Sequence, residues 1–187
     1  NLYTWLWETL RLAKNPQLEA ELAALEPDGH GLTVLPFLAG ERSPDWAGNV
    51  GATLHGLTLA TTPIAILRAG LEAVAYRFAV IQQRLLGDDG APHRLIASGG
   101  ALLHSPAWRQ IFADVLGQPL VASAETEATS RGAALLALRA LGALPDLDAL
   151  PAADGPVCEP DPGRHAIYQA ALARQHLRET PERFLKG

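Results

Sequence analysis

Helical and strand-like segments follow one another along the chain, separated by turns rich in glycine and proline. Leucines at every fourth position predict an amphipathic helix over residues 2–13. A second helix is expected where Asn15 can cap and Pro16 can take the first helical position. Residues 63–86 form the longest apolar segment, and a turn at 87–92 closes it. Charged and amide side chains interrupt this segment, so it predicts a mostly buried helix of a soluble protein rather than a membrane span.

Short runs of branched and apolar residues predict strands at 32–38 and 52–59. From residue 93 onward, strands and helices are expected in alternation, at 93–98 (strand), 106–116 (helix), 119–123 (strand) and 128–141 (helix). Helices that connect successive strands are typical of a parallel α/β sheet. The proline-rich stretch 145–162 is interpreted as a surface wrap, and a last helix is expected at 165–177.

Composition and charge argue against several classes of function. The 187 residues are 48% hydrophobic and 19% charged, which is typical of one globular core. A net charge of -5 without any lysine or arginine run argues against nucleic acid as a partner. Cys158 is the sole cysteine and the histidines never occur as HxxxH, so we expect a reducing, cytoplasmic setting and no metal held by this chain alone. The sequence lacks an initiator methionine, and we expect it to be a piece of a longer protein.

A pair of glycines marks the candidate site. Gly99 and Gly100 directly follow the strand predicted at 93–98 and precede a helix that Ser105 can cap. Glycines at the carboxyl end of a parallel strand let a ligand approach the backbone, and the nearby helix N-terminus favours an anion. Neither a P-loop nor a GxGxxG fingerprint is present, so these residues alone leave a structural corner and a ligand-binding turn both open.

Four segments in order extend this local pattern: "LPFLAGERSP", "GATLHGLTLATTPIAILRAGLEAVAYRF", "IASGGALLHSPAWRQIFADVLGQPLV" and "ETEATSRGAALLALRALG". Together they make residues 1–144 resemble the C-terminal domain of the FGGY carbohydrate kinases, which belong to the actin/hexokinase/Hsp70-type ATPase superfamily. Two positions depart from the family's pattern, Ala65 where a polar residue is expected and Gly70 where a larger one is. The positions that fit are Ala52, Leu54, Gly56, Leu57, Ile66, Ala69, Leu71 and Glu72.

The resemblance implies a fold and a division of the chain. The expected fold is α/β, a partial RNase H-like (actin-like ATPase) C-terminal domain with parallel strands and crossover helices that lacks its leading strands. Such a sheet leaves an uncovered edge that invites self-association. Residues 1–31 would form a helical lead-in segment, residues 32–144 the nucleotide-side core, and residues 145–187 a proline-rich wrap and the C-terminal helix.

The same resemblance implies roles for single residues. Gly99 and Gly100 would lie against the ribose and phosphates of ATP, with His104 and Ser105 near the adenine. A plain helix cap is the alternative for Ser105, and a solvated loop residue is the alternative for His104.

Glu41 and Arg42 lie in a loop that approaches the interlobe cleft in similar kinases, where an arginine can pair with phosphate. A buried ion pair that holds the loop is the alternative, and Trp46 is expected to pack under the same loop. Arg68 and Glu72 are expected to form an ordinary i, i+4 pair.

The implied function is ATP-dependent, Mg²⁺-assisted phosphoryl transfer to a sugar or sugar acid, with gluconate favoured over xylulose and glycerol. The resemblance places the catalytic aspartate upstream of this chain, so we expect no catalytic residue here and an inactive fragment. The missing N-terminal lobe of the same protein is the expected partner, and a homo-oligomer is possible. A non-catalytic nucleotide-binding or assembly module of the same superfamily is the alternative, and the missing GxGxxG argues against a dinucleotide oxidoreductase.

Overall fold

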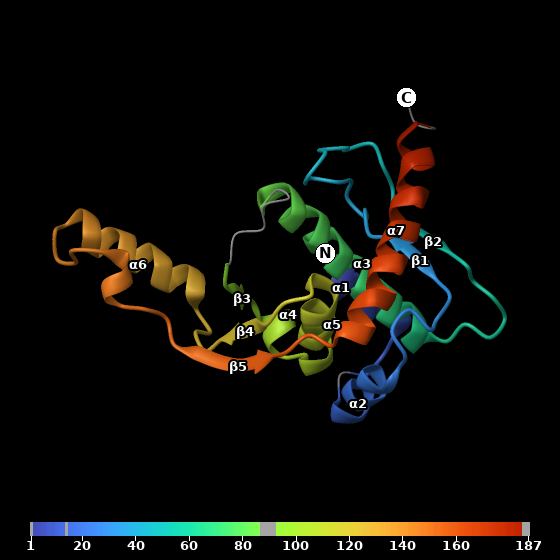
Figure 1. Ribbon diagram of the computed structural model, residues 1–187, viewed down its shortest axis with the longest axis horizontal. Helices are drawn as coiled ribbons and strands as arrows, with labels where there is room; N and C mark the ends of the chain where they lie inside the picture. Colours follow the sequence, from blue (N-terminus) through green and yellow to red (C-terminus); the bar gives the residue numbers. More distant parts are fainter. Residues whose placement is uncertain (1, 14, 87–92, 185–187) are drawn as a thin grey trace.

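The computed structural model describes residues 2–13, 15–86 and 93–184, so the turn predicted at 87–92 lies outside the described residues. Figure 1 shows its helices and strands. In chain order they are α1 (Leu2–Leu10), α2 (Pro16–Ala24), β1 (Thr33–Leu35), β2 (Thr53–His55), α3 (Pro63–Leu86), β3 (Leu95–Ala97), α4 (Gly100–Leu103), α5 (Pro106–Leu116), β4 (Leu120–Ser123), α6 (Ala128–Ala140), the 3-10 helix η1 (Leu147–Ala149), β5 (Asp154–Cys158) and α7 (Pro162–Phe184).

Local signals set the ends of several helices. Both α3 and α5 begin and end at the predicted residues. Asn15 caps α2 by accepting a hydrogen bond from the backbone nitrogen of Leu18 at 2.8 Å. By contrast, α1 stops at Leu10, three residues earlier than predicted, because Arg11 takes a positive φ of 52° that does not continue a helix.

Five short strands form two separate sheets. Strands β1 and β2 pair antiparallel, whereas β3, β4 and β5 form a three-stranded sheet in that order. The register of β3 and β4 is parallel and pairs Leu95 with Leu120, with α5 in the crossover between them. Strand β5 runs antiparallel to β4, which corrects the interpretation of residues 145–162 as a plain surface wrap.

The core lies where α1, α3, α5 and α7 meet (Figure 1). A Cβ at Gly70 would stand 2.5 Å from Leu6 Cδ1, so a larger residue at this position would require the Leu6 side chain of α1 to move. Trp108 of α5 donates its indole N–H to the carbonyl of Leu71 in α3 at 3.0 Å, and Tyr3 of α1 stacks on the same ring. One core therefore draws on segments from both ends of the chain.

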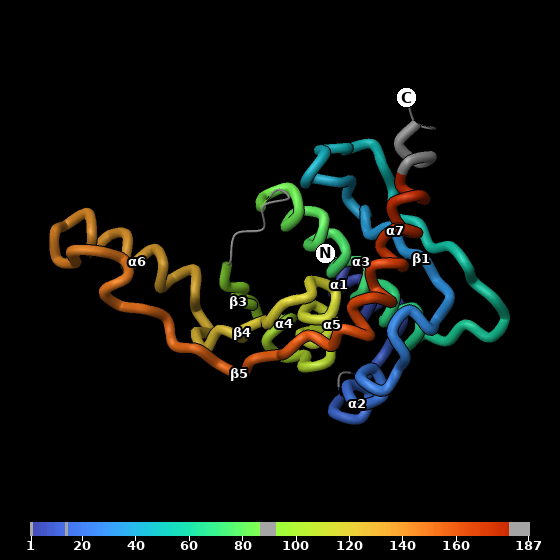
Figure 2. The backbone as a smooth tube through the Cα atoms, in the orientation of Figure 1, coloured from blue at the N-terminus to red at the C-terminus, as the bar shows by residue number. Residues whose placement is uncertain are grey.

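Helix α6 projects to one side of this core, as Figure 2 shows. None of its residues is buried, and Leu141 just beyond its end is 81% exposed. Arg131 ties the helix to the chain after η1 by donating to the Leu150 carbonyl at 2.7 Å. Among the described residues, none of the helices has the length and apolarity that a membrane crossing requires.

The long loop between β1 and β2 differs from its prediction at one position. Trp46 is 76% exposed and has a positive φ of 56°, so its ring stands in solvent. The expectation that Trp46 packs under this loop is therefore wrong. Phe37 and Val50 make the small apolar cluster beneath the loop instead, together with Leu35.

Candidate functional site

A pocket of about 560 Å³ lies at the carboxyl ends of the parallel strands β3 and β4. Its size falls within the range of small-molecule sites, and its position is where open α/β sheets bind ligands. The chain after β3 and the chain after β4 each supply part of the wall. The first supplies Gly100, Leu103 and His104, and the second supplies Thr126 and Glu127, next to Ser123 at the end of β4.

The backbone requires glycine at position 99 but not at position 100. Gly99 caps α4 with a φ of 95°, which strains any residue that has a Cβ. Gly100 has no such φ, and a Cβ there would meet nothing closer than His104 Cδ2 at 3.8 Å. Neither backbone strain nor packing against the described residues therefore requires glycine at position 100. Its missing side chain leaves the pocket open beside the backbone.

His104 and Ser105 have different surroundings. His104 is exposed in the pocket, and its imidazole makes no hydrogen bond with the described residues, while its backbone nitrogen closes α4 on Gly100 at 3.0 Å. Ser105 is buried outside the lining, and its hydroxyl accepts from the Trp108 nitrogen at 3.2 Å as the cap of α5. The structure thus gives Ser105 the capping role rather than a direct place in this pocket.

Glu19 of α2 occupies the N-terminus of α5. Its Oε1 accepts from the Ser105 hydroxyl at 2.9 Å and from the Ala107 nitrogen at 2.8 Å. A carboxylate already satisfies this helix end and its dipole. The anion that the sequence led us to expect at this helix N-terminus is therefore a side chain of the same protein.

Two pocket residues went unrecognised as site residues in the sequence. Arg109 of α5 lies in the wall, and Glu127 does so at the start of α6. The available signal for Glu127 was that it lies in the short connection between the predicted strand 119–123 and the predicted helix 128–141, as the glycines lie between the preceding strand and helix. No comparable signal pointed to Arg109, because its contacts depend on α4, a helix that the sequence did not predict.

Glu41 and Arg42 have opposite environments. Glu41 is buried and pairs with Arg77 of α3, which also donates to Glu179 of α7 at 2.5 Å and lies over the Phe37 ring. This ion pair anchors the loop between β1 and β2 to two helices. Arg42 is exposed and makes no ion pair with the described residues. The buried ion pair given as the alternative for this loop is therefore present, formed by Glu41 with Arg77, and contact of Arg42 with a ligand stays a prediction.

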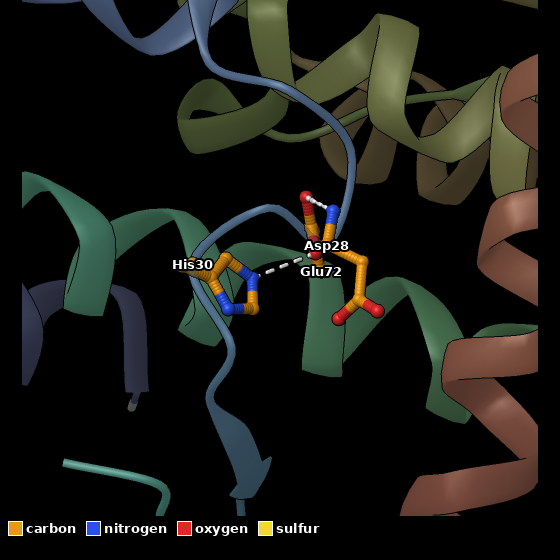
Figure 3. Close-up of side chains that lie close together, drawn as sticks. All are labelled: Asp28, His30 and Glu72. Carbon is orange, nitrogen blue, oxygen red and sulfur yellow. Dashed lines mark hydrogen bonds and ion pairs between the residues drawn. The ribbon is translucent and has the colours of Figure 1, made fainter.

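Three potential metal ligands gather away from this pocket. Asp28, His30 and Glu72 place one ligand atom each within 4.8 Å of one another. Figure 3 shows the His30 ring and the Asp28 backbone nitrogen facing the Glu72 carboxylate, while the Asp28 carboxylate points away. His30 Nδ1 accepts from the Leu32 nitrogen at 3.0 Å, so Nε2 carries the proton and donates to Glu72 at 3.0 Å. Both ring nitrogens are engaged, which favours a hydrogen-bonded network over a metal centre.

Arginines complete this network. Arg174 pairs with the Asp28 carboxylate, and Arg68 donates to Glu72 at 2.6 Å, so the expected i, i+4 pair is a buried one. Arg68 also donates to the Leu22 carbonyl at 2.7 Å. Burial raises the pKa of Glu72, but the hydrogen bond from His30 and the charge of Arg68 outweigh it, so the net pKa lies below the usual range.

Burial acts on the neighbouring hydroxyl groups as well. Burial and the Glu72 charge together raise the pKa of Tyr76 and Tyr168 far above the ordinary value, so both phenols stay protonated donors. Tyr168 donates to Glu72 at 3.2 Å and accepts from Arg68 at 2.7 Å. The cluster therefore joins α3 to α7 and to the chain after α2.

Comparison with known proteins decides the family. The profile of the FGGY family of carbohydrate kinases, C-terminal domain, matches residues 1–141. The chain belongs to this family. Its curated relatives include glycerol kinases. The one from Koribacter versatilis is 33% identical over 138 residues, which cover 74% of this chain and 28% of that protein. The one from Paracidovorax citrulli is 36% identical over 153 residues, or 79% and 30%.

Solved structures agree on the fold of this FGGY domain. The ligand-bound xylulose kinase from Lactobacillus acidophilus matches with a TM-score of 0.85 at 28% identity, and the match covers 100% of this chain and 38% of that chain. The gluconate kinase from the same organism matches with a TM-score of 0.84 at the same identity and coverage. The predicted actin-like ATPase fold is thereby confirmed. This FGGY domain spans less than a third of the two curated relatives.

Proposed function

We propose that this FGGY domain is the nucleotide-side, C-terminal part of an ATP-dependent carbohydrate kinase. The whole enzyme would transfer the γ-phosphoryl group of ATP to a hydroxyl of a sugar or sugar acid. The pocket at the ends of β3 and β4 is the proposed adenine-nucleotide site. The reducing cytoplasm, which suits the free thiol of Cys158, is the proposed setting.

The empty space beside the backbone of Gly100 is the observation that supports this site. The pocket wall is bare backbone at a position where neither φ nor packing demands glycine. A planar or sugar-like ligand can lie against such a surface without displacing a side chain. In this proposal Gly99 and Gly100 face the ribose and phosphates, and His104 borders the adenine. Ser105 contributes indirectly, by capping α5 directly after the turn.

The proposed enzyme needs groups from outside this chain. Phosphoryl transfer requires an oriented acceptor hydroxyl, a base and Mg²⁺ around the phosphates. Glu127 is the single carboxylate among the described residues that line the pocket, whereas Mg²⁺ in a protein takes several oxygen ligands. We therefore propose that Mg²⁺ enters with ATP and that the base aspartate belongs to the N-terminal lobe. By itself this chain is proposed to be catalytically inactive.

A size series at Gly100 tests the nucleotide site in the full-length protein. The Gly100→Ala protein should keep the wild-type affinity for ADP, because the nearest atom to its Cβ, His104 Cδ2, would lie 3.8 Å away. The Gly100→Trp protein should bind ADP more than tenfold more weakly, because the indole would fill the pocket. Calorimetry of ADP binding measures both, and the melting temperature checks that each variant is folded. Equal affinity of the wild type and Gly100→Trp would overturn the assignment.

The acceptor is tested separately, by assaying the full-length protein with MgATP and gluconate, xylulose, ribulose or glycerol. The segments "GERSPDW" and "IASGG" favour gluconate, while the sequence relatives reported above are glycerol kinases. Turnover of one acceptor supports the kinase proposal and names its substrate. Nucleotide binding without turnover of any of the four would instead favour a non-catalytic module.

A further inference from the structure

Arg109 is a buried cation in the wall of the proposed nucleotide pocket. It lies on α5 and is only 9% exposed. None of the described carboxylates pairs with Arg109, and its Nε atom is buried without a hydrogen-bond partner among those residues. Burying a charge without a counter-charge is costly, and stability alone gives no reason to retain it. The hydrogen bonds that Arg109 does make must therefore explain why an arginine is buried at this position.

Those contacts all go to one short helix. Arg109 Nη1 donates to the carbonyl of Leu102 at 3.1 Å and to the carbonyl of Leu103. These are the last two residues of α4, where helix carbonyls lack partners inside the helix. The Leu102 carbonyl also accepts from the Ser105 nitrogen at 3.3 Å. A cation at this end is also attracted by the partial negative charge of the helix terminus.

Helix α4 has few other contacts with the body of the protein. None of its residues is buried, and of its apolar side chains Leu102 packs, half-buried, against the core. Yet it contributes Gly100 and Leu103 to the pocket, and His104 follows at its end. The position of these three pocket groups thus depends in part on the Arg109 guanidinium, which reaches back from α5.

We propose that Arg109 is a positioning residue that fixes α4, so that Gly100 and His104 meet the nucleotide in one geometry. The proposal rests on the nucleotide site proposed above. Two consequences follow. Loss of Arg109 weakens nucleotide binding without affecting the acceptor, and it relaxes discrimination between bases, because His104 is no longer held at a fixed place.

The test uses the full-length protein with ADP and GDP as probes. Arg109→Met keeps an unbranched apolar side chain and removes both hydrogen bonds. Arg109→Lys keeps the positive charge and an N–H donor, but not the planar guanidinium group. Arg84→Met is the matched control, because Arg84 is a half-exposed arginine of α3 paired with Asp45 at 2.5 Å. Calorimetry gives the Kd for each nucleotide, steady-state kinetics gives KM for ATP and for the acceptor, and thermal melting reports folding.

We expect Arg109→Met to raise the Kd for ADP about tenfold or more and to bring the ADP and GDP values closer together. Arg109→Lys should recover part of the loss, and Arg84→Met should stay within about twofold of wild type. KM for the acceptor should not change. An unchanged Kd for ADP in Arg109→Met, with Gly100→Trp still defective, overturns this inference and leaves the nucleotide site intact. Parallel increases in both KM values with an unchanged ADP to GDP ratio also overturn it, because they indicate general destabilisation.

Discussion

Replacing Glu72 with glutamine removes one charge from the buried centre of α3 while keeping the size of the side chain. Glu72 accepts hydrogen bonds from Arg68 Nε at 2.6 Å, His30 Nε2 at 3.0 Å, the Tyr168 hydroxyl at 3.2 Å and the Tyr76 hydroxyl at 3.3 Å. Glutamine has one acceptor oxygen, and its amide nitrogen can only donate. At least one donor must therefore lose its partner, and Arg68 becomes an unpaired buried cation.

The size of the effect follows from the burial of both partners. The Arg68 and Glu72 side chains are 5% and 1% exposed, so water cannot replace the lost carboxylate. Removing one partner of such a pair costs about 3–5 kcal/mol. For a chain of this length, each kcal/mol lowers the melting temperature by about 2–4 °C, so a decrease of about 6–20 °C is expected for Glu72→Gln.

Urea denaturation and thermal melting, both followed by circular dichroism, measure this change. Asp154→Asn is the matched control, because Asp154 pairs with Arg94 at the surface, where the two side chains are 56% and 52% exposed. The control should lose less than about 1 kcal/mol. Adding Arg68→Met to Glu72→Gln should restore part of the stability by removing the unpaired cation. A free energy of unfolding for Glu72→Gln equal to that of the control would refute the reasoning.

Three further predictions rest on single contacts. Because the folded pKa of Glu72 lies below its unfolded value, its stabilisation is present above about pH 4.3 and lost as the pH falls through the folded pKa. Urea titrations from pH 7 to 3 should therefore show wild type and Glu72→Gln converging in acid. Ser105→Ala should cost about 1 kcal/mol in urea denaturation through loss of the α5 cap, with ADP affinity within about twofold of wild type. Gly117→Ala should lower the melting temperature, because Gly117 has a φ of 66° and a Cβ there would stand 2.7 Å from His165.

The parts of the fold that local signals determine were predictable from the sequence. Pro63 fixes the start of α3, and Ser105 and Gly117 fix the two ends of α5, because each acts on backbone groups within a few residues. Strand β5 was missed because Gly155 and Pro156 are unfavourable in a strand taken by itself. They are tolerated at a sheet edge, and only the pairing with β4, more than 30 residues earlier in the chain, reveals that edge.

Part of the candidate site was also predictable from local signals. The glycines could be singled out because they follow a strand, where open α/β sheets bind ligands, and this position is a local property. The carboxylate that occupies the end of α5 could not, because Glu19 lies 86 residues before Ser105 in the chain. The role of Arg109 depends on α4, which forms immediately after Gly99 and carries no helix signal of its own.

Among the described residues, the buried network around Glu72 and the turn that Arg109 contacts share no hydrogen-bonding side chain. The bond from Trp108 to the Leu71 carbonyl links their immediate neighbours in the chain. Changes at sites without shared partners usually add, within about 0.3–0.5 kcal/mol. Glu72→Gln should therefore lower the stability and leave the affinity for ADP intact, Arg109→Met should do the reverse, and the double variant should show the sum. A double variant that departs from this sum would indicate that the bond between Trp108 and Leu71 couples core stability to the geometry of the turn at Gly99 and Gly100.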